Sequence, residues 1–370
     1  MASQITGIIF LPASRIQRNP GRTGGSPYAV KPFLTASAFT LQWHITQACD
    51  LRCRHCYDRT DRPAPTLAQA VKILDDLEEF CRKKRVKGQV SFSGGNPLLH
   101  PDFLGIYRAA AERGFTLAVL GNPVPRGQIE DLIAIQPPDF FQVSLEGLPE
   151  YNDFIRGTGH FDRTMAFLDL LGDLGIYSMV MLTLTQDNIR EVFPLGERLR
   201  GRADVLHFNR LAKVGGGAAL ELPGKEAYRA LLDAYLDASR ENPLLGLKDN
   251  LLNIPMLRGG LAPFGGCTGF GCGAAFNFLA LLSDGEVHAC RKFPSPLGNV
   301  FLQRLEEIYD SELAQRYRSG CVECRSCWFA PVCGGCLACA YSHGFDVFVR
   351  KDPYCFLSEC SSHSRRAGLT

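Results

Sequence analysis

Short apolar runs alternate with segments of helical periodicity through residues 39–215, and this alternation constrains the fold more than any other feature of the chain. Apolar runs bounded by turn residues predict strands, and apolar residues three and four apart predict helices. Strands are predicted at residues 39–46, 89–93, 115–120, 140–145, 177–185 and 205–208. Helices are predicted at residues 66–86, with Thr66 as N-cap, and at 102–113, 127–135, 161–174 and 188–200. Repeated strand–helix units predict an α/β fold, a partial (β/α)6 barrel with its helices outside.

Three cysteines follow the first predicted strand with the spacing Cys49-x3-Cys53-x2-Cys56. Three thiolates at this spacing can hold three irons of a [4Fe–4S] cluster, whereas ferredoxin motifs supply a fourth thiolate. The fourth iron then has no protein ligand and can bind a small molecule directly. The spacing therefore indicates chemistry rather than electron transfer alone.

Polar residues and glycines also follow the other predicted strands. Ligands of parallel sheets gather at the C-terminal ends of the strands, so these residues are candidate site residues. They are Gly94, Gly95 and Asn96 after the second strand, Asn122 after the third, Ser144 and Glu146 in the segment that ends the fourth, Arg156 in the segment that follows it, and Arg210 after the sixth.

A second group of cysteines lies in residues 260–360, which are also rich in glycine. Their order is Cys267-x4-Cys272, Cys290, Cys324-x2-Cys327-x5-Cys333-x2-Cys336 and Cys355. A hairpin is expected from residues 278–282 and 286–289, with Gly285 at its turn. Clustered cysteines in a reducing compartment bind metal more often than they form disulfides. Zinc is the alternative to iron for Cys-x2-Cys pairs considered alone.

Composition limits the cellular location and the binding partners that can be expected for this protein. The chain has 370 residues, 15 cysteines and a formal net charge of +2, without a dense basic stripe, so nucleic acid is not an expected partner. It lacks a basic segment followed by a long apolar run near its start, and its longest apolar stretches are too short to span a bilayer. A cytoplasmic protein is therefore expected.

The cysteine triplet, with His55 just before its last member, resembles that of the radical S-adenosylmethionine (SAM) enzymes. The run Gly94-Gly95-Asn96-Pro97 resembles the family's Gly-Gly-Glu-Pro segment, which meets the amino group of SAM, but Asn96 lacks the negative charge of glutamate. By resemblance Ser144 and Glu146 would contact the ribose, Asn122 the adenine or ribose, and Arg210 the cofactor carboxylate. The string from Arg156 to Asp162 resembles radical SAM enzymes that modify peptides, and Arg156 could pair with a carboxylate.

The C-terminal cysteines resemble those of the SPASM domain, whose eight cysteines bind two auxiliary [4Fe–4S] clusters. The resemblance implies two ligand sets, Cys267, Cys272, Cys290 and Cys336 for the first cluster, and Cys324, Cys327, Cys333 and Cys355 for the second. Cys339 is a rival for the role of Cys336, and Cys321 leaves the second set open. Cys81 is expected to be a packed thiol and Cys360 an unligated one.

The resemblance implies a radical SAM maturase that cleaves SAM and abstracts hydrogen from a residue of a ribosomally synthesised precursor peptide. The product would be a thioether, a carbon–carbon crosslink, an epimer or a heterocycle, and a flavodoxin- or ferredoxin-type protein would supply electrons. Asn96 also suggests a small branch linked to selenium- or sulfur-containing peptides. The alternatives are a sulfatase-type formylglycine maturase, a haem or quinone cofactor biosynthesis enzyme, an iron–sulfur electron carrier and a zinc-stapled binding protein.

The expected organisation has five parts. They are an N-terminal lead (1–38), the radical SAM barrel (39–215), a bridging region (216–265), the SPASM domain (266–360) and a tail (361–370). The lead is shorter than the winged-helix module, roughly a hundred residues long, that binds leader peptides in many maturases. We therefore expect either a separate leader-binding protein or direct recognition of the substrate.

Overall fold

One curved sheet organises the structure, a computed structural model that describes residues 16–17 and 31–357. In the described part the sheet has nine strands in the order β6-β5-β4-β3-β2-β1-β7-β8-β9. Its six parallel barrel strands are β1 (Ala38–Thr46), β2 (Lys87–Gly94), β3 (Thr116–Leu120), β4 (Phe140–Ser144), β5 (Ser178–Leu184) and β6 (Val205–Arg210). All six predicted strands, and with them the partial barrel, are confirmed.

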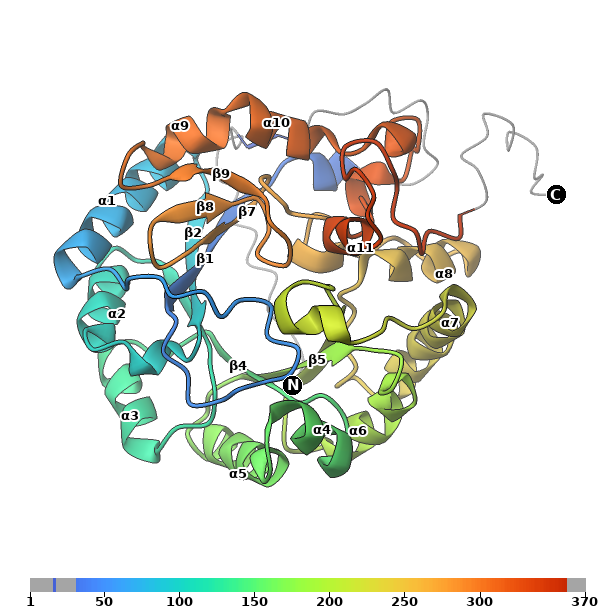
Figure 1. Cartoon of the computed structure of the whole chain (residues 1–370), viewed down its shortest axis with the longest axis horizontal. Helices are drawn as coiled ribbons and strands as arrows, with labels where there is room; N and C mark the ends of the chain where they lie inside the picture. The colour runs from blue at the N-terminus through green and yellow to red at the C-terminus, as the bar shows by residue number, and fades with distance from the viewer. Residues whose placement is uncertain (1–15, 18–30, 358–370) are drawn as a thin grey trace.

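Helices cover the outside of the barrel strands (Figure 1). They are α1 (Leu67–Lys84), α2 (Phe103–Glu112), α3 (Arg126–Ile135), α5 (His160–Asp173) and α6 (Val192–Arg198). The predicted cap of α1 is present, because Thr66 Oγ1 accepts a hydrogen bond from Gln69 N at 3.3 Å. The Gln69 side chain in turn accepts from Thr66 N at 2.9 Å, which completes a capping box. A further helix, α4 (Pro149–Arg156), was not predicted.

Apolar side chains of the strands form the core between the sheet and its helices. Trp43 of β1 and Phe92 of β2 are completely buried and stack with their ring centroids 6.1 Å apart. Phe103 of α2 packs edge-on against Phe92 at 5.4 Å. Burial of such large rings supplies much of the favourable free energy of folding and fixes the strand ends that carry the polar site residues.

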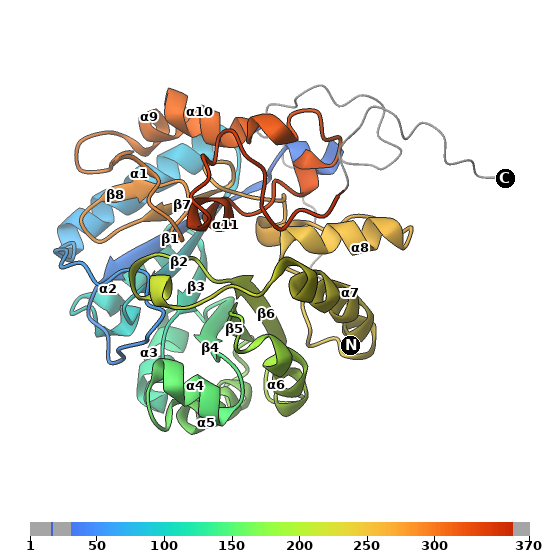
Figure 2. The ribbon, with the colours of Figure 1, turned by 45° about the vertical axis from the view of Figure 1, so that its right-hand side comes forward.

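The cysteine-rich segment extends the same sheet. β7 (Phe278–Leu281) pairs in parallel with β1, and β8 (Glu286–His288) and β9 (Pro296–Asn299) continue as antiparallel strands. The predicted hairpin is therefore confirmed, with Gly285 at a φ of 85° in its turn. The remaining helices are α7 (Lys225–Glu241), α8 (Asn253–Arg258), α9 (Leu305–Asp310), α10 (Glu312–Ser319) and α11 (Leu337–Ser342). Figure 2 shows α9, α10 and α11 on the side of the barrel next to β7.

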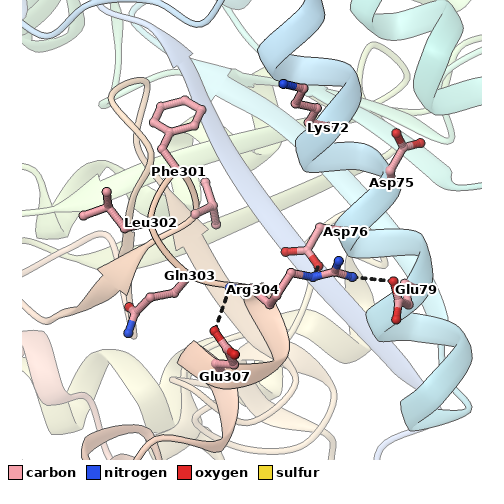
Figure 3. Close-up of a pocket in the computed structure, with 10 residues that line it drawn as sticks. Lys72, Asp75, Asp76, Glu79, Phe301, Leu302, Gln303, Arg304 and Glu307 are labelled. Atoms are coloured by element: carbon pink, nitrogen blue, oxygen red, sulfur yellow. Dashed lines mark hydrogen bonds and ion pairs between the residues drawn. The ribbon is translucent and has the colours of Figure 1, made fainter.

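Charged side chains join α1 to the segment around α9. A cavity of about 500 Å³ lies there, lined on one side by Asp76 and Glu79 and on the other by Arg304 (Figure 3). Arg304 Nε lies 2.6 Å from Asp76 Oδ1, and Lys83 Nζ lies 2.7 Å from Glu306 Oε2. Each exposed ion pair of this kind contributes little to the free energy of unfolding. We therefore expect these pairs to orient α9 relative to α1 rather than to stabilise the contact between them.

The expected domain boundaries stay a prediction, because the sheet passes from the barrel strands into β7 without a break. Most of the lead (1–38), Cys360 and the tail (361–370) lie outside the described residues. Across residues 16–17 and 31–357, no helix is both long enough and apolar enough to cross a membrane.

Candidate active site

Cys49, Cys53 and Cys56 lie together in the loop between β1 and α1, as their spacing predicts. Burial raises the pKa of Cys53, the guanidinium of Arg156 opposes this, and the neighbouring thiolates of Cys49 and Cys56 would raise it further. Arg156 Nη1 donates to Cys53 Sγ at 3.6 Å, and Asn122 Nδ2 donates to Cys49 Sγ at the same distance. Such donors stabilise sulfur in its anionic form, which is the form that binds metal.

Glycines after β6 pack against this cysteine loop, and sequence reasoning missed them. Gly216 N donates to Cys56 O at 2.8 Å. A Cβ at Gly216 would lie 2.3 Å from Arg54 O, and one at Gly215 would lie 2.6 Å from Tyr57 O. The run of three glycines at residues 215–217 was the available signal, because it permits two backbones to approach this closely.

Gly94 and Gly95 fix the end of β2 against the same loop. Gly95 N donates to Thr46 O at 2.8 Å, and Asn96 N donates to Ala48 O at 2.7 Å. A Cβ at Gly95 would lie 2.1 Å from Ala48 O, and Gly94 has a φ of 131°. The glycines are therefore required by contact with the cysteine loop, and that contact holds Asn96 beside it.

Asp50, which the sequence did not single out, lies between Asn96 and Asn122. Asn96 Nδ2 donates to Asp50 Oδ1 at 3.2 Å, and Asn122 Nδ2 donates to the same oxygen at 2.7 Å. Asn96 is 1% exposed, and its own Oδ1 is buried without a hydrogen-bond partner in the described structure. A buried, unpaired acceptor is costly, so it indicates a place where a donor from a ligand can bind.

Glu146 links two other predicted site residues, His55 and Arg156, in a buried ion-pair network. Its Oε1 lies 3.0 Å from His55 Nε2 and accepts from Arg156 Nε at 2.9 Å, while Oε2 accepts from Thr183 N at 2.7 Å. Burial alone would raise the pKa of Glu146, but Arg156 and His55 lower it to about 2. Both carboxylate oxygens are thus already engaged within the protein, and contact with a ribose stays a prediction for this residue.

Ser144 and Arg210 end β4 and β6, as expected, but differ in accessibility. The hydroxyl of Ser144 makes no hydrogen bond to any described residue and is free to meet a ligand. Arg210 is 1% exposed, and its guanidinium binds Asp249 at 2.8 Å and Asp352 at 2.7 Å. Because its donors are already paired, the predicted contact of Arg210 with a cofactor carboxylate would require these ion pairs to open.

The first expected set of auxiliary ligands lies together. Burial raises the pKa of Cys290 to about 11, and the thiolates of Cys336 and Cys267 are near enough to raise it as well. Cys272 is affected in the same way by Cys290, Cys267 and Cys336. Cys339 is hydrogen-bonded to Cys336, which lowers the pKa of Cys336, so the choice between these two as ligand stays open.

The second expected set, Cys324, Cys327, Cys333 and Cys355, also lies together. Burial raises the pKa of Cys333, and the thiolates of Cys355 and Cys327 add to this effect. A hydrogen bond with Cys321 raises the pKa of Cys324, so Cys321 remains a rival ligand. Cys81 is buried away from both groups in α1, where burial raises its pKa to about 12, as expected for a packed thiol.

Two cations after Cys290 connect the groups of cysteines, and sequence reasoning missed both. Arg291 Nη2 donates to Asp58 Oδ2 at 2.5 Å and its guanidinium lies over the ring of Tyr57, so it reaches the loop of Cys56. Lys292 Nζ donates to Arg210 O at 2.7 Å. Burial would lower the pKa of Lys292, but the thiolates of Cys336 and Cys339 raise it. The positive charge of Lys292 therefore lies among the first auxiliary set.

These donor sets fit iron–sulfur clusters. In the described ranges no three His, Cys, Asp or Glu side chains close around a single ion. Each cysteine of a cluster binds a different iron, so cluster ligands stand further apart than the four ligands of a zinc ion. Three thiols beside an unpaired Asn96 oxygen suit a cluster with an open position, and each set of four suits a closed one.

Comparison with known families decides the assignment. A model described as the radical SAM superfamily matches residues 43–195, and a model of the SPASM iron–sulfur cluster-binding domain matches residues 272–328. The chain therefore contains a radical SAM domain and a SPASM domain. Its cofactors are therefore SAM, the [4Fe–4S] cluster of the radical SAM domain and auxiliary iron–sulfur clusters.

Several curated relatives share most of this length. The AdoMet-dependent haem synthase of Methanosarcina barkeri is 24% identical, over 87% of this radical SAM chain and 97% of that protein. The antilisterial bacteriocin subtilosin biosynthesis protein AlbA of Bacillus subtilis is 26% identical, over 80% and 66%. The mycofactocin maturase MftC of Mycolicibacterium smegmatis is 27% identical, over 85% and 82%.

Solved structures support the fold. Streptococcus suis SuiB bound to its precursor peptide SuiA superposes with a TM-score of 0.69 at 19% identity, over 89% of this chain and 78% of that one. Native anSMEcpe with bound AdoMet superposes with a TM-score of 0.65 at 16% identity, over 85% of this chain and 94% of that one. At these identities the likeness establishes the fold alone.

Proposed function

We propose that this radical SAM enzyme is a maturase of a ribosomally synthesised precursor peptide. The observation that carries the proposal is the presence of one open set of three thiols and two sets of four thiols in a single chain. Relatives named for bacteriocin biosynthesis and mycofactocin maturation, and a fold neighbour bound to a precursor peptide, support the choice of substrate.

Cys49, Cys53 and Cys56 would hold the cluster that binds SAM, and the buried Asn96 oxygen would accept from the bound cofactor. When bound and reduced, this pair supplies a 5′-deoxyadenosyl radical, which abstracts hydrogen from an unactivated C–H bond. The chain positions the reactants: Arg156 holds Cys53 and Glu146 in one network. The glycines at 215–217 bring their backbone into contact with Cys56 on one side of the loop.

The auxiliary sets would bind the substrate or accept the electron that a substrate radical must lose. Arg291 supports this role, because it connects the segment after Cys290 directly with Asp58 in the loop of the first cluster. A flavodoxin- or ferredoxin-type donor would reduce the enzyme. The expected ligands stay Cys267, Cys272, Cys290 and Cys336 for one cluster and Cys324, Cys327, Cys333 and Cys355 for the other.

A second candidate function is the synthesis of haem or a related cofactor. The observation in its favour is that this chain covers 97% of the length of the haem synthase relative, more than of the bacteriocin and mycofactocin proteins. Anaerobic incubation with SAM and a reductant, followed by mass spectrometry, separates the two. A peptide encoded beside this gene should lose hydrogen mass on crosslinking, or take up deuterium from D2O on epimerisation, whereas an oxidised haem precursor with unchanged peptide would favour the second candidate.

The iron content tests the cofactor assignment itself. Anaerobically reconstituted protein should contain about twelve irons per chain, from one open and two closed four-iron clusters. The Cys49→Ala/Cys53→Ala/Cys56→Ala variant should retain about eight irons and release no 5′-deoxyadenosine. Zinc in place of iron, or no SAM cleavage by the wild type, would contradict the proposed function.

A further inference from the structure

The carboxylate of Asp50 has a free oxygen next to the first cysteine of the open set. Its Oδ1 accepts from both Asn96 and Asn122, at 3.2 and 2.7 Å. No described residue donates to Oδ2, and the side chain is accessible. Two amide donors on one oxygen orient the carboxylate and leave the other oxygen available to a ligand.

A second free acceptor lies beside Asp50. Asn96 is 1% exposed, and its Oδ1 has no partner in the described structure. Backbone hydrogen bonds from Gly95 N to Thr46 O and from Asn96 N to Ala48 O fix this side chain relative to the cysteine loop. The site therefore has an accessible anionic oxygen on Asp50 and, beside it, a neutral oxygen on Asn96 that is buried next to Gly121, where a Cβ would lie 3.1 Å from it.

Nearby charges define what such a site can accept. Asn96 and Asn122 are neutral, so Asp50 supplies the negative charge in this group. Arg156, the cation of the neighbouring network, faces Cys53 and is paired with Glu146. An amino group with N–H donors fits the carboxylate oxygen of Asp50 and the amide oxygen of Asn96, whereas Arg52, Arg54 and Arg163, which line the same pocket, suit an anionic group.

We propose that Asp50 and Asn96 together bind the amino group of SAM, with Asp50 supplying the negative charge that Asn96 lacks. The inference rests on the proposed function, since it requires SAM at the open position beside Cys49. Asp50, which lies between Cys49 and Cys53, would thus share a binding role that the family resemblance gives only to the segment after β2.

Binding of SAM to anaerobically reconstituted protein, measured by equilibrium dialysis without reductant, tests this role independently of catalysis. Asp50→Asn should weaken SAM binding at least about tenfold, because a charge-assisted hydrogen bond becomes a neutral one. Asp61→Asn is the matched control, since Asp61 lies further along the same loop, is exposed and makes no hydrogen bond or ion pair with any described residue. It removes the same charge and should leave the affinity unchanged.

Exchanging the carboxylate and the amide between positions 50 and 96 tests the role of the negative charge more directly. The double variant Asp50→Asn/Asn96→Asp exchanges the two side chains without changing their size, so it should recover most of the affinity lost by Asp50→Asn. A SAM analogue that lacks the α-amino group should bind the wild type and Asp50→Asn equally well. Iron content should be the same in all variants.

Three outcomes would overturn the inference: unchanged SAM affinity in Asp50→Asn, equal weakening for SAM and the deaminated analogue, or loss of iron in both Asp50→Asn and the double variant. The last two would show that Asp50 supports the loop or the cluster rather than the amino group. Failure of the wild type itself to bind SAM would instead contradict the proposed function.

Discussion

At the scale of single residues, the site depends on buried charges that compensate one another. Glu146 is 1% exposed, yet it remains ionised because Arg156 and His55 contact the same oxygen and Thr183 N contacts the other. Arg156 in turn contacts Cys53, so a change at Glu146 is transmitted to the cysteine loop. Removing one member of a buried ion pair leaves the other charge unpaired, which is the costly arrangement.

Glu146→Gln should lower the free energy of unfolding by about 3–5 kcal/mol at pH 7, because Arg156 loses its counter-charge. The folded pKa of Glu146, about 2, lies below its ordinary value of 4.5. Its contribution is therefore present above pH 4.5 and is lost as the pH falls toward 2, an effect of about 3 kcal/mol. Urea unfolding of wild type and variant before cluster reconstitution should show their difference shrinking across this window.

The same residue shows the limits of sequence reasoning. The family resemblance of the segment that ends the fourth strand identified Glu146 as a site residue, but its partners are 10 and 91 residues away in the chain, at Arg156 and His55. Asp50 was missed for a similar reason, since its neighbours Asn96 and Asn122 come from the ends of β2 and β3. Periodicity predicts where a strand ends, whereas such contacts depend on how several strand ends meet.

At the scale of elements, the barrel strands and the first helices were predictable because each has a strong local pattern. The capping box at Thr66 and the apolar runs of β1 to β6 are examples. The pairing of β7 with β1 was not predictable, because it joins segments more than 200 residues apart. The short helix α4 was missed because it has too few apolar residues to show a helical pattern. Two of its carbonyl oxygens, Phe154 O and Ile155 O, accept hydrogen bonds from Arg54.

The end of β2 and the cysteine loop lie so close together that position 95 has no room for a side chain. Gly95→Ala should displace that contact, because a Cβ would lie 2.1 Å from Ala48 O, where the obstacle is backbone and not a flexible side chain. The variant should lose about four irons, those of the open cluster, and keep the auxiliary ones. Gly127→Ala in α3 is the control, since nothing lies within 4 Å of its added Cβ, and helix propensity favours alanine by up to about 1 kcal/mol. Equal iron content in the two variants would refute this view of the junction.

At the scale of the whole molecule, Arg210 joins three parts of the chain. It ends β6, binds Asp249 of the bridging region and binds Asp352 near the end of the described chain. Asp352 Oδ2 also accepts from Cys336 N at 2.8 Å, and Asn250 Nδ2 donates to Gly335 O at 2.6 Å. Arg210 and its two carboxylates are therefore one buried connection between the barrel and the first auxiliary set.

Two roles for Arg210 make opposite predictions. If it holds the parts together, Arg210→Met should lower the free energy of unfolding by about 3–5 kcal/mol, because Asp249 and Asp352 lose their cation. It should also reduce auxiliary iron, since Asp352 positions Cys336, while SAM affinity of the folded fraction changes less than about threefold. Arg210→Lys retains the charge and should be intermediate in stability.

The contact predicted from the sequence, between Arg210 and the cofactor carboxylate, would produce the reverse pattern. SAM affinity would then fall by tenfold or more, about 1.4 kcal/mol or above, while stability and auxiliary iron stayed near the wild type. Thermal unfolding, iron analysis and equilibrium dialysis on the same preparations distinguish the two patterns. Because the guanidinium is 1% exposed and both carboxylates are already bound to it, we expect the first pattern.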